Sequence, residues 1–563
     1  MFENRKSCQL TRTAAAGLFV SALLAGTALC ASPAHASVAC TDMTSLVIPN
    51  TTIDIAQAIP AGTYTPTGSG AIANLPAFCR VHGFVSPVPG SVIGFEVWMP
   101  DAGWNTKIEM FGNGGYSSSL DYSDMGAQLI RGYATLSTDT GHAYSTDGDP
   151  DFAVGHPQAI IDWGHRAVHQ SILKAKQVVH AFYGSRAAHA YFSGCSTGGH
   201  QALMEVQRYP TDFDGVIGGD PGNNRTHLNA GFLWEYLVDH PFGDDNDPIL
   251  PATKLPVLTH AVIAVCQAQN GARDGGLSSD NFLNDPRDCN FDPSILQCPN
   301  NVDAPDCLTT AQIQTAQAIY AGPHDPVDGT LIENGYEPGS EAAAEPGLNW
   351  SSYFQDFNGL NEPARTNFWK YWVFDNPNWD WWTFNFDTDM KKTDNKLAGP
   401  INAMNPDISA FEDAGGKLIQ YHGWADPVVP SLESINYYDR VLGQEGGSIH
   451  TPSILRQTQS FYRLFMVPGM GHCSGGPGPT SFAAPMQSAL EQWVEQGTAP
   501  ASIVGTSYLN NTPSEGVAYT RPLCPYPQKP YYQGGDPDAA ASFVCKNDLR
   551  NHPTPIPAPE WLR

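Results

Sequence analysis

One short stretch of the sequence constrains the fold more than any other, because it forces a sharp turn between a strand pattern and a helix pattern. A buried, strand-like segment at 190–193 precedes the turn, and a helical segment at 201–208 follows it. The turn itself reads Gly194-Cys195-Ser196-Thr197-Gly198. Glycine is needed on both sides of so tight a reversal, since side chains there would collide with the neighbouring backbone. The stretch therefore predicts a strand–turn–helix unit that lifts the Ser196 hydroxyl above the edge of a sheet.

Strand and helix patterns alternate through the chain on both sides of this turn. Strand patterns lie at 92–99, 107–111, 133–137, 417–421 and 462–467, and helix patterns lie at 161–182, 432–442 and 485–496. Such alternation predicts an α/β fold, with a mostly parallel sheet that helices cover on both faces.

The middle of the chain, residues 223–404, breaks the alternation. It contains loops bounded by cysteines, one helix pattern at 309–320 and a stretch dense in aromatic residues. We interpret it as an insertion into an α/β domain made of residues 37–222 and 405–563, with a Pro-rich tail as a C-terminal extension.

Composition excludes several classes of protein. Of 563 residues, 41% are hydrophobic, which is enough for a sizeable core and excludes a disordered chain. With 29 Lys and Arg against 56 Asp and Glu, the formal net charge is −27. A chain this acidic repels nucleic acid and anionic membranes, so neither is an expected partner.

The first 36 residues have the pattern of a secretory signal peptide. A basic start is followed by an apolar stretch at 14–30 and by the small-residue site Ala34-His35-Ala36. A membrane anchor is less favoured, because polar residues and glycine interrupt the stretch and it is short for a bilayer span. We predict cleavage after Ala36, a secreted or periplasmic protein without a membrane anchor, and ten remaining cysteines suited to an oxidising compartment.

A serine nucleophile needs a base, and the base needs a carboxylate to orient it. Two loops that follow the late strand patterns supply them: Asp426 follows 417–421, and His472 follows 462–467. Both loops start at the carboxyl ends of strands, where catalytic loops of an open α/β sheet lie. We predict Ser196, Asp426 and His472 as a catalytic triad. His422 is interpreted as a turn residue beside Asp426, and His200 as a packing residue on the elbow helix.

Two cysteines flank the predicted nucleophile and base. Cys195 precedes Ser196, and Cys473 follows His472. If the serine and the histidine meet, the two cysteines meet as well, so we predict a disulfide between them.

The oxyanion of a tetrahedral intermediate needs preorganised N–H donors. One is expected to be the N–H of Thr197, directly after the nucleophile. The other is expected in the glycine-rich stretch 112–115, from Gly115, with Gly114 as the alternative. Asp139 and His142, which follow another strand pattern, are expected to support this edge.

With these motifs the chain resembles the tannase and feruloyl esterase family, which includes a mono(2-hydroxyethyl) terephthalate hydrolase. The resemblance runs from about Cys40 to Cys545 and is carried by Cys195-Ser196, Asp426 and His472-Cys473, with support from 111–115, 138–142 and 472–478. It implies an α/β-hydrolase fold with a large inserted lid. The implied activity is a secreted serine carboxylic ester hydrolase for small aromatic esters of feruloyl, galloyl or terephthaloyl type. A catalytically silent binding protein and a secreted serine peptidase are the competing functions.

Further features follow from the resemblance. Together with local spacing it suggests five disulfides: Cys40–Cys79, Cys195–Cys473, Cys266–Cys289, Cys298–Cys307 and Cys524–Cys545. It also implies a calcium loop, whose positions here are Gln267, Asn270, Ala272, Asp274 and Gly276. Amides replace two of the expected carboxylates, which weakens a calcium site. A disulfide-closed surface loop is therefore the preferred interpretation, and the chemistry is expected to need no cofactor.

The aromatic stretch at 368–386 is expected to be mostly core, with a few rings facing the substrate. Trp372 and Phe374 are the predicted contacts. Lys370 is the only lysine or arginine between Asn367 and Met390, and is predicted to meet a substrate carboxylate.

Overall fold

The structure, a computed structural model, describes residues 37–142, 150–270, 276–342, 348–354 and 361–549. The predicted signal peptide lies outside these ranges and stays a prediction. Within them, none of the helices combines the length and apolar character that crossing a bilayer requires.

The chain is organised around a nine-stranded mixed sheet, with the order β1-β4-β5-β7-β6-β8-β9-β10-β11. Its strands are β1 (Thr51–Ile59), β4 (Phe78–Val85), β5 (Ile93–Pro100), β6 (Lys107–Phe111), β7 (Ala134–Thr138), β8 (His189–Cys195), β9 (Gly215–Gly219), β10 (Lys417–Gly423) and β11 (Tyr462–Val467). Strands β1, β4, β5 and β7 pair antiparallel, and every pair from β7 to β11 is parallel. The α/β class predicted from the alternation is therefore confirmed.

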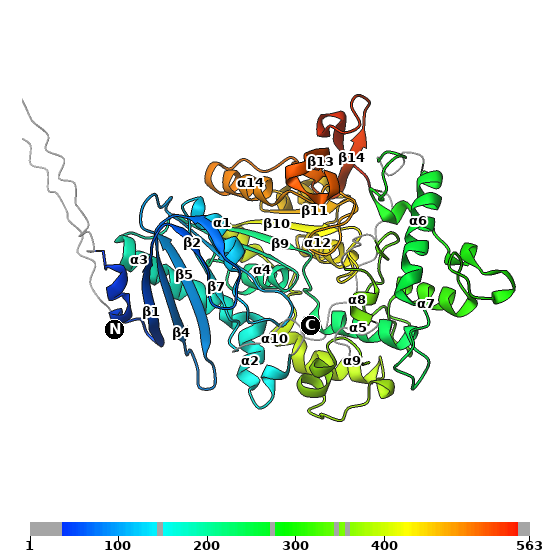
Figure 1. Ribbon diagram of the computed structural model, residues 1–563, viewed down its shortest axis with the longest axis horizontal. Coiled ribbons are helices and arrows are strands. Elements are labelled where there is room, and N and C mark those ends of the chain that lie inside the picture. The colour runs from blue at the N-terminus through cyan, green and yellow to red at the C-terminus, as the bar shows by residue number, and fades with distance from the viewer. Residues whose placement is uncertain (1–36, 143–149, 271–275, 343–347, 355–360, 550–563) are drawn as a thin grey trace, which may run out of the picture.

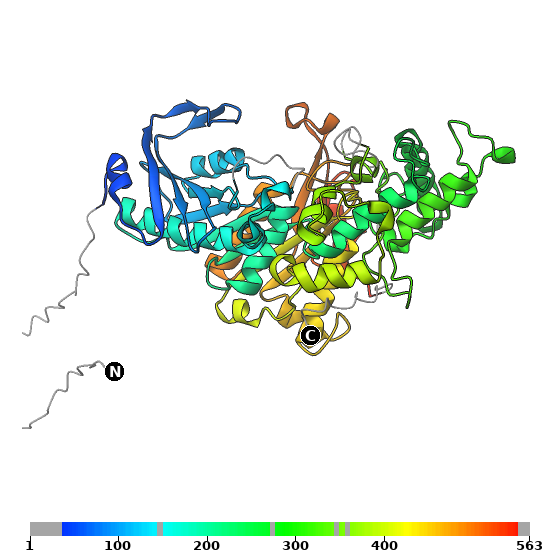
Figure 2. The same cartoon turned by 90° about the horizontal axis from the view of Figure 1, so that it is seen from below.

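Helices cover both faces of the sheet (Figures 1 and 2). They are α1 (Tyr122–Ile130), α2 (Pro157–Ile161), α3 (Ala167–Tyr183), α4 (Thr197–Arg208), α12 (Leu432–Gln444), α13 (Pro452–Thr458) and α14 (Ala483–Gln496). The helix expected at 161–182 is divided by a π-turn at Asp162–Arg166, which separates α2 from α3.

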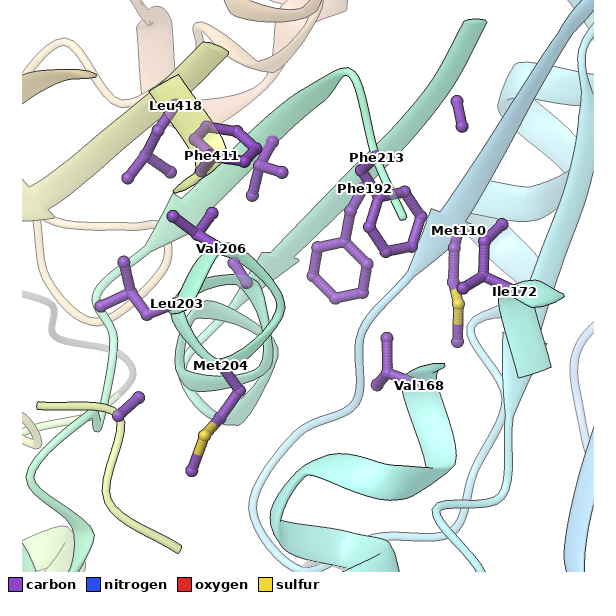
Figure 3. Close-up of a cluster of buried hydrophobic side chains, with 14 of the residues drawn as sticks. Met110, Val168, Ile172, Phe192, Leu203, Met204, Val206, Phe213, Phe411 and Leu418 are labelled. Atoms are coloured by element: carbon purple, nitrogen blue, oxygen red, sulfur yellow. The ribbon is translucent and has the colours of Figure 1, made fainter. Parts of the chain in front are cut away.

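Alternate residues of each parallel strand pack on opposite faces. In β8, Phe192 belongs to the cluster formed with α3 and α4, whereas Tyr191 belongs to the cluster formed with α14. Figure 3 shows the first cluster around the elbow helix α4, where Leu203 and Val206 lie beside Phe411 and Leu418. This period of two, with both faces apolar, is what a buried parallel sheet requires.

The chain between β9 and β10 folds as helices and loops beside the sheet, at the side away from β1 (Figure 1). Its helices are α5 (Arg225–Asp239), α6 (Leu255–Asn270), α7 (Thr310–Ala321), α8 (Ser351–Phe354), α9 (Thr388–Thr393), α10 (Gly399–Ile401) and α11 (Ser409–Asp413). The domain boundaries at 223 and 404 stay predictions.

Short two-stranded sheets complete the described fold. They are β2 (Gly62–Tyr64) with β3 (Ile72–Leu75), β12 (Ile503–Tyr508) with β13 (Val517–Leu523), and β14 (Gln528–Tyr532) with β15 (Phe543–Asn547). The Cys524–Cys545 disulfide joins the residue after β13 to β15, within the predicted C-terminal extension. The Tyr526 N–H donates to the Leu464 oxygen on β11 at 2.7 Å, so the extension contacts the main sheet.

The elbow helix can approach the sheet only because its first turn is built of glycine. A Cβ added at Gly199 would lie 2.2 Å from the Gly219 carbonyl oxygen and 3.0 Å from the Pro221 Cα, both of which are backbone atoms. We therefore expect Gly199→Ala to lower the free energy of unfolding by about 3 kcal/mol, measured by urea denaturation. Gly443→Ala in α12 is the control, since its Cβ meets no atom within 4 Å, and it should be neutral or slightly stabilising. Equal effects of the two substitutions would contradict the packing argument.

Candidate active site

The nucleophile turn has the backbone that the sequence predicted. Strand β8 ends at Cys195, helix α4 begins at Thr197, and Ser196 between them has φ 62° and ψ −116°. Such a conformation is strained for a residue with a side chain and persists only where its surroundings hold it. The Ser196 N–H donates to the Gly219 oxygen at 2.9 Å, and a Cβ at Gly194 would lie 2.7 Å from the Gly198 Cα. The turn therefore holds the serine at the end of the sheet, partly exposed.

The predicted acid lies in the loop directly after β10. Asp426 is buried, and its Oδ1 accepts the N–H groups of Val428 at 2.7 Å and Val429 at 3.0 Å. Its Oδ2 lies 2.7 Å from His472 Nδ1. Burial by itself raises the pKa of Asp426, but His472 and His422 together hold that pKa well below its ordinary value. Asp426 is therefore ionised at neutral pH.

The predicted base lies in the loop after β11. The Nδ1 of His472 faces Asp426, which is the ring orientation that the histidine of a triad requires. The loop is tight: the Ser474 N–H donates to the His472 oxygen at 2.7 Å, and Cys473 has φ 62°. The Cys195–Cys473 disulfide brings these two Cα atoms to 5.8 Å across 278 residues of sequence. It thus joins the residue before Ser196 to the residue after His472.

A second buried carboxylate, Asp220, was missed by the sequence analysis. It follows β9 directly, and its Oδ1 and Oδ2 accept the N–H groups of Gly423 at 2.7 Å and Cys473 at 2.9 Å. Its Oδ2 also lies 3.3 Å from Cys195 Sγ. Burial raises the pKa of Asp220 to about 6, against the opposing effect of His422. Asp220 therefore holds the acid loop and the base loop against the nucleophile turn. The sequence signal for it was an aspartate directly after a strand.

The predicted oxyanion loop packs directly on the elbow. A Cβ at Gly112 would lie 2.6 Å from the Gly198 Cα, and the Asn113 N–H donates to Gln201 on α4 at 3.0 Å. Among the described residues, the N–H groups of Thr197 and Gly115 contact no hydrogen-bond acceptor. Their role as the two oxyanion donors stays a prediction.

Neighbouring side chains hold the predicted oxyanion loop and the start of α4 in place. Arg225 Nη2 donates to the Thr197 hydroxyl at 2.8 Å, and Trp163 Nε1 donates to the Gly115 oxygen at 3.3 Å. His142 Nε2 lies 2.9 Å from the oxygen of Tyr116, and Asp139 accepts the Gly94 N–H at 2.8 Å.

The backbone N–H of His200 donates to the Ser196 oxygen at 3.0 Å, but the His200 ring bonds elsewhere. It is fully buried in α4, with Nε2 2.7 Å from the Ile401 oxygen, and burial lowers its pKa to about 3. The ring is therefore neutral, and it stacks on Trp163.

The three predicted substrate contacts lie in a dense aromatic cluster. Trp372 is fully buried, with its indole N–H donating to the Pro150 oxygen at 2.7 Å. Phe374 stacks on Trp379 with ring centroids 5.0 Å apart. Lys370 Nζ lies 3.2 Å from the Glu362 carboxylate, so its charge already has a partner. Substrate contact by these residues stays a prediction.

Part of the implied calcium loop, residues 271–275 with Ala272 and Asp274, lies outside the described residues. Gln267 is described: its amide donates to the Asp280 oxygen at 3.2 Å and the Phe282 oxygen at 3.0 Å. Asn270 ends α6, and Gly276 begins the next described range. The calcium site stays a prediction.

The described cysteines form the five pairs that the resemblance suggested. They are Cys40–Cys79, Cys195–Cys473, Cys266–Cys289, Cys298–Cys307 and Cys524–Cys545.

A pocket of about 1100 Å³ lies behind the catalytic loops. Its walls come from α6, from the β12–β13 region and from the loops that carry Asp426 and His472. Trp424 and Gly475 line it, whereas the triad side chains do not.

The chain is similar to known proteins over most of its length. The family model described as tannase and feruloyl esterase matches residues 79–546. The chain is 41% identical to an uncharacterized esterase of Xanthomonas campestris pv. campestris, over 92% of each chain. It is 32% identical to a probable feruloyl esterase B-2 of Aspergillus oryzae, over 91% of this chain and 96% of that one.

Solved structures with a similar fold are also known. The crystal structure of feruloyl esterase B from Aspergillus oryzae superposes with a TM-score of 0.79 at 27% identity, over 90% of this chain and all (100%) of that one. Tannin acyl hydrolase from Aspergillus niger has the same fold, with a TM-score of 0.71 at 23% identity over 90% and 93%. The α/β-hydrolase fold expected from the resemblance is confirmed.

The Cys195–Cys473 disulfide should matter for activity as well as for folding. On the chain-entropy model, closing so long a loop stabilises the native state by roughly 5 kcal/mol. A displacement of about 1 Å between serine and base costs about 100-fold in rate. We therefore expect the double variant Cys195→Ser with Cys473→Ser to lose about 100-fold in kcat in esterase assays while its far-UV circular dichroism persists at low temperature.

The control pair is Cys524→Ser with Cys545→Ser, which removes a disulfide of the C-terminal sheet. It should lower the melting temperature and leave kcat within about twofold. Equal losses of kcat from the two double variants would contradict a specific role for the Cys195–Cys473 disulfide.

Proposed function

The chain belongs to the tannase and feruloyl esterase family of carboxylic ester hydrolases, and we propose that it hydrolyses aromatic esters by a serine mechanism. The observation that carries this proposal is the 2.7 Å contact between Asp426 Oδ2 and His472 Nδ1, on a loop that a disulfide joins to the strained Ser196 turn.

The first half-reaction transfers the acyl group to Ser196. The Oγ of Ser196 attacks the ester carbonyl carbon as His472 Nε2 takes its proton. The carbonyl oxygen becomes an oxyanion, to which the N–H groups of Thr197 and Gly115 donate. The carbon–oxygen bond of the ester then breaks, and the alcohol leaves with the proton from His472.

The second half-reaction repeats these steps with water. His472 removes a proton from water, which attacks the acyl-enzyme carbonyl through the same oxyanion site. Ser196 leaves with the proton from His472, and the carboxylic acid is released. Ionised Asp426 stabilises the imidazolium in both halves, and these steps use side chains and backbone groups of this chain alone.

The substrate proposal is an ester of a small aromatic acid, of feruloyl, galloyl or terephthaloyl type. The names of the relatives support an aromatic acyl group. The aromatic cluster supports it as well, because Trp372 packs edge-on against Tyr116, the residue after Gly115, with ring centroids 5.4 Å apart.

We further propose that the protein is secreted or periplasmic. Five disulfides support an oxidising compartment, in agreement with the predicted signal peptide.

The nucleophile is tested by Ser196→Ala. We expect kcat for methyl ferulate to fall by at least about 1000-fold, because the acyl-enzyme can no longer form. Labelling by a fluorophosphonate probe, followed by peptide mapping, should place the label on Ser196 in the unmodified protein and abolish it in the variant. The control is Ser45→Ala in the exposed N-terminal turn, which should keep full labelling. Near-complete activity of Ser196→Ala would refute the serine mechanism.

The proposed role of Lys370 is tested with two variants that act in opposite directions. Lys370→Ala should raise KM up to about fivefold for aryl esters that carry a free carboxylate, and Glu362→Gln, which removes the competing charge, should lower it. Methyl esters without a carboxylate should be unaffected by either variant. Similar shifts for acidic and neutral esters would exclude a charge contact with the substrate.

A further inference from the structure

A second histidine contacts the catalytic acid. His422 is fully buried near the end of β10, and its Nε2 lies 3.3 Å from Asp426 Oδ2, the same oxygen that contacts His472. Nε2 also makes a hydrogen bond with the Val429 oxygen at 3.0 Å, and Asp220 Oδ1 lies 3.7 Å from it. Every one of these groups is an acceptor, so Nε2 carries a hydrogen whatever the charge of the ring.

The other ring nitrogen ends a chain of buried donors. Nδ1 lies 2.6 Å from Ser434 Oγ, which accepts the amide N–H of Gln420 at 2.7 Å. The oxygen of the Gln420 side chain in turn accepts the Tyr462 hydroxyl. Because Ser434 already accepts one hydrogen, its own hydroxyl hydrogen is available to Nδ1. When the His422 ring is neutral, donation runs in one direction, from Tyr462 through Gln420 and Ser434 to His422, whose Nε2–H faces the Val429 oxygen and Asp426.

This series of hydrogen bonds is longer than is needed to give the buried His422 ring its hydrogen-bond partners. A backbone oxygen and one hydroxyl would satisfy the ring nitrogens of His422. Instead, β10, β11 and α12 each contribute a fully buried polar residue to this series of hydrogen bonds. Hydrogen bonds that run in one direction polarise one another, so the last N–H of the chain is a strengthened donor. That donor faces the catalytic carboxylate.

We propose that His422 is a positioning residue of the proposed hydrolase: its Nε2–H fixes the Asp426 carboxylate and restrains the basicity of His472. The inference rests on the proposed serine mechanism. Oδ1 of Asp426 is held by two backbone N–H groups and Oδ2 by two imidazoles, so the carboxylate has a single orientation. The Nε2–H of His422, with Nε2 3.3 Å from Oδ2, draws charge away from that oxygen and so weakens the stabilisation of the His472 imidazolium.

The sign of the pH effect follows from the groups around His422. Asp220 faces it from the end of β9, Asp426 from its own loop, and Glu433 acts on it from α12. Loss of the Nε2–H leaves Asp426 a stronger acceptor for His472, whether His422 was neutral or charged. The pKa of His472 then rises, and the acid limb of kcat/KM moves to higher pH. A merely structural loss that let Asp426 turn away would move the limb to lower pH.

Two amide variants separate the two ring nitrogens. The side chain of His422→Gln places an N–H near the position of Nε2, whereas His422→Asn ends near the position of Nδ1. We expect His422→Asn to lower kcat by about 10- to 100-fold with KM within about twofold, the usual range for a residue that orients a catalytic group. Its acid limb should rise by about half a pH unit to one pH unit. His422→Gln should recover most of kcat and the original limb.

His240→Asn is the control for disturbing a buried histidine, since His240 contacts the Tyr236 oxygen in α5 and lies outside the catalytic loops. It should lower stability without moving the acid limb. If His422→Asn does not fold, His422→Leu, which also lacks the Nε2–H, takes its place. An unmoved or lowered limb in the folded variant, or equal defects in the Gln and Asn variants, overturns the inference. Its failure is distinct from failure of the proposed function, which would appear as an active Ser196→Ala enzyme.

Discussion

Every part of the proposed site depends on loops that leave neighbouring parallel strands at one edge of the sheet and must be held together there. Asp220 does this with one carboxylate, since it accepts an N–H from the end of β10, where the acid loop begins, and an N–H from the base loop. It also follows the strand that supports the Ser196 turn. Two N–H groups partly offset the cost of burying this charge. Its raised pKa, about 6, shows that a net cost remains.

The effect of burying Asp220 on stability depends on pH in a definite direction. A carboxylate whose folded pKa lies above its unfolded value contributes stability at low pH and loses it as pH rises through the window from about 4 to about 6. At neutral pH the ionised Asp220 is therefore a destabilising group in the folded state. The structure retains it where its oxygens hold the two catalytic loops, which is the trade expected of a residue that serves geometry rather than stability.

The places of Ser196, Asp426 and His472 after strands could be predicted from the sequence because each has a local signal, whereas the set of five disulfides was suggested by the family resemblance together with local spacing. The turn at Ser196 needs its two glycines, and Cys195 and Cys473 mark residues that meet if the serine and histidine meet. Strands β6 and β11 match their patterns residue for residue. These strands were readable because each is a short, mostly apolar run of the length of a buried strand.

The rest could not be predicted because its signals are not local. Strand β9 has little β propensity, and it forms because its glycines leave room for partners: a Cβ at Gly219 would lie 2.0 Å from the Tyr421 ring. Asp220 follows that strand, so it was missed with it. His422 was assigned to a turn, yet it lies within β10, and its hydrogen bonds are with Ser434 on α12 and the Val429 oxygen, contacts that only the fold creates.

The site is therefore held by constraints of different physical kinds that act on different pairs of loops. A disulfide joins the nucleophile turn to the base loop, glycine packing presses the oxyanion loop on the elbow helix, and buried hydrogen bonds fix the acid loop. Removing one constraint leaves the others in place, so single substitutions should loosen the geometry instead of abolishing the fold. Rate depends on sub-ångström placement whereas folding does not, so activity is the more sensitive measure of each constraint.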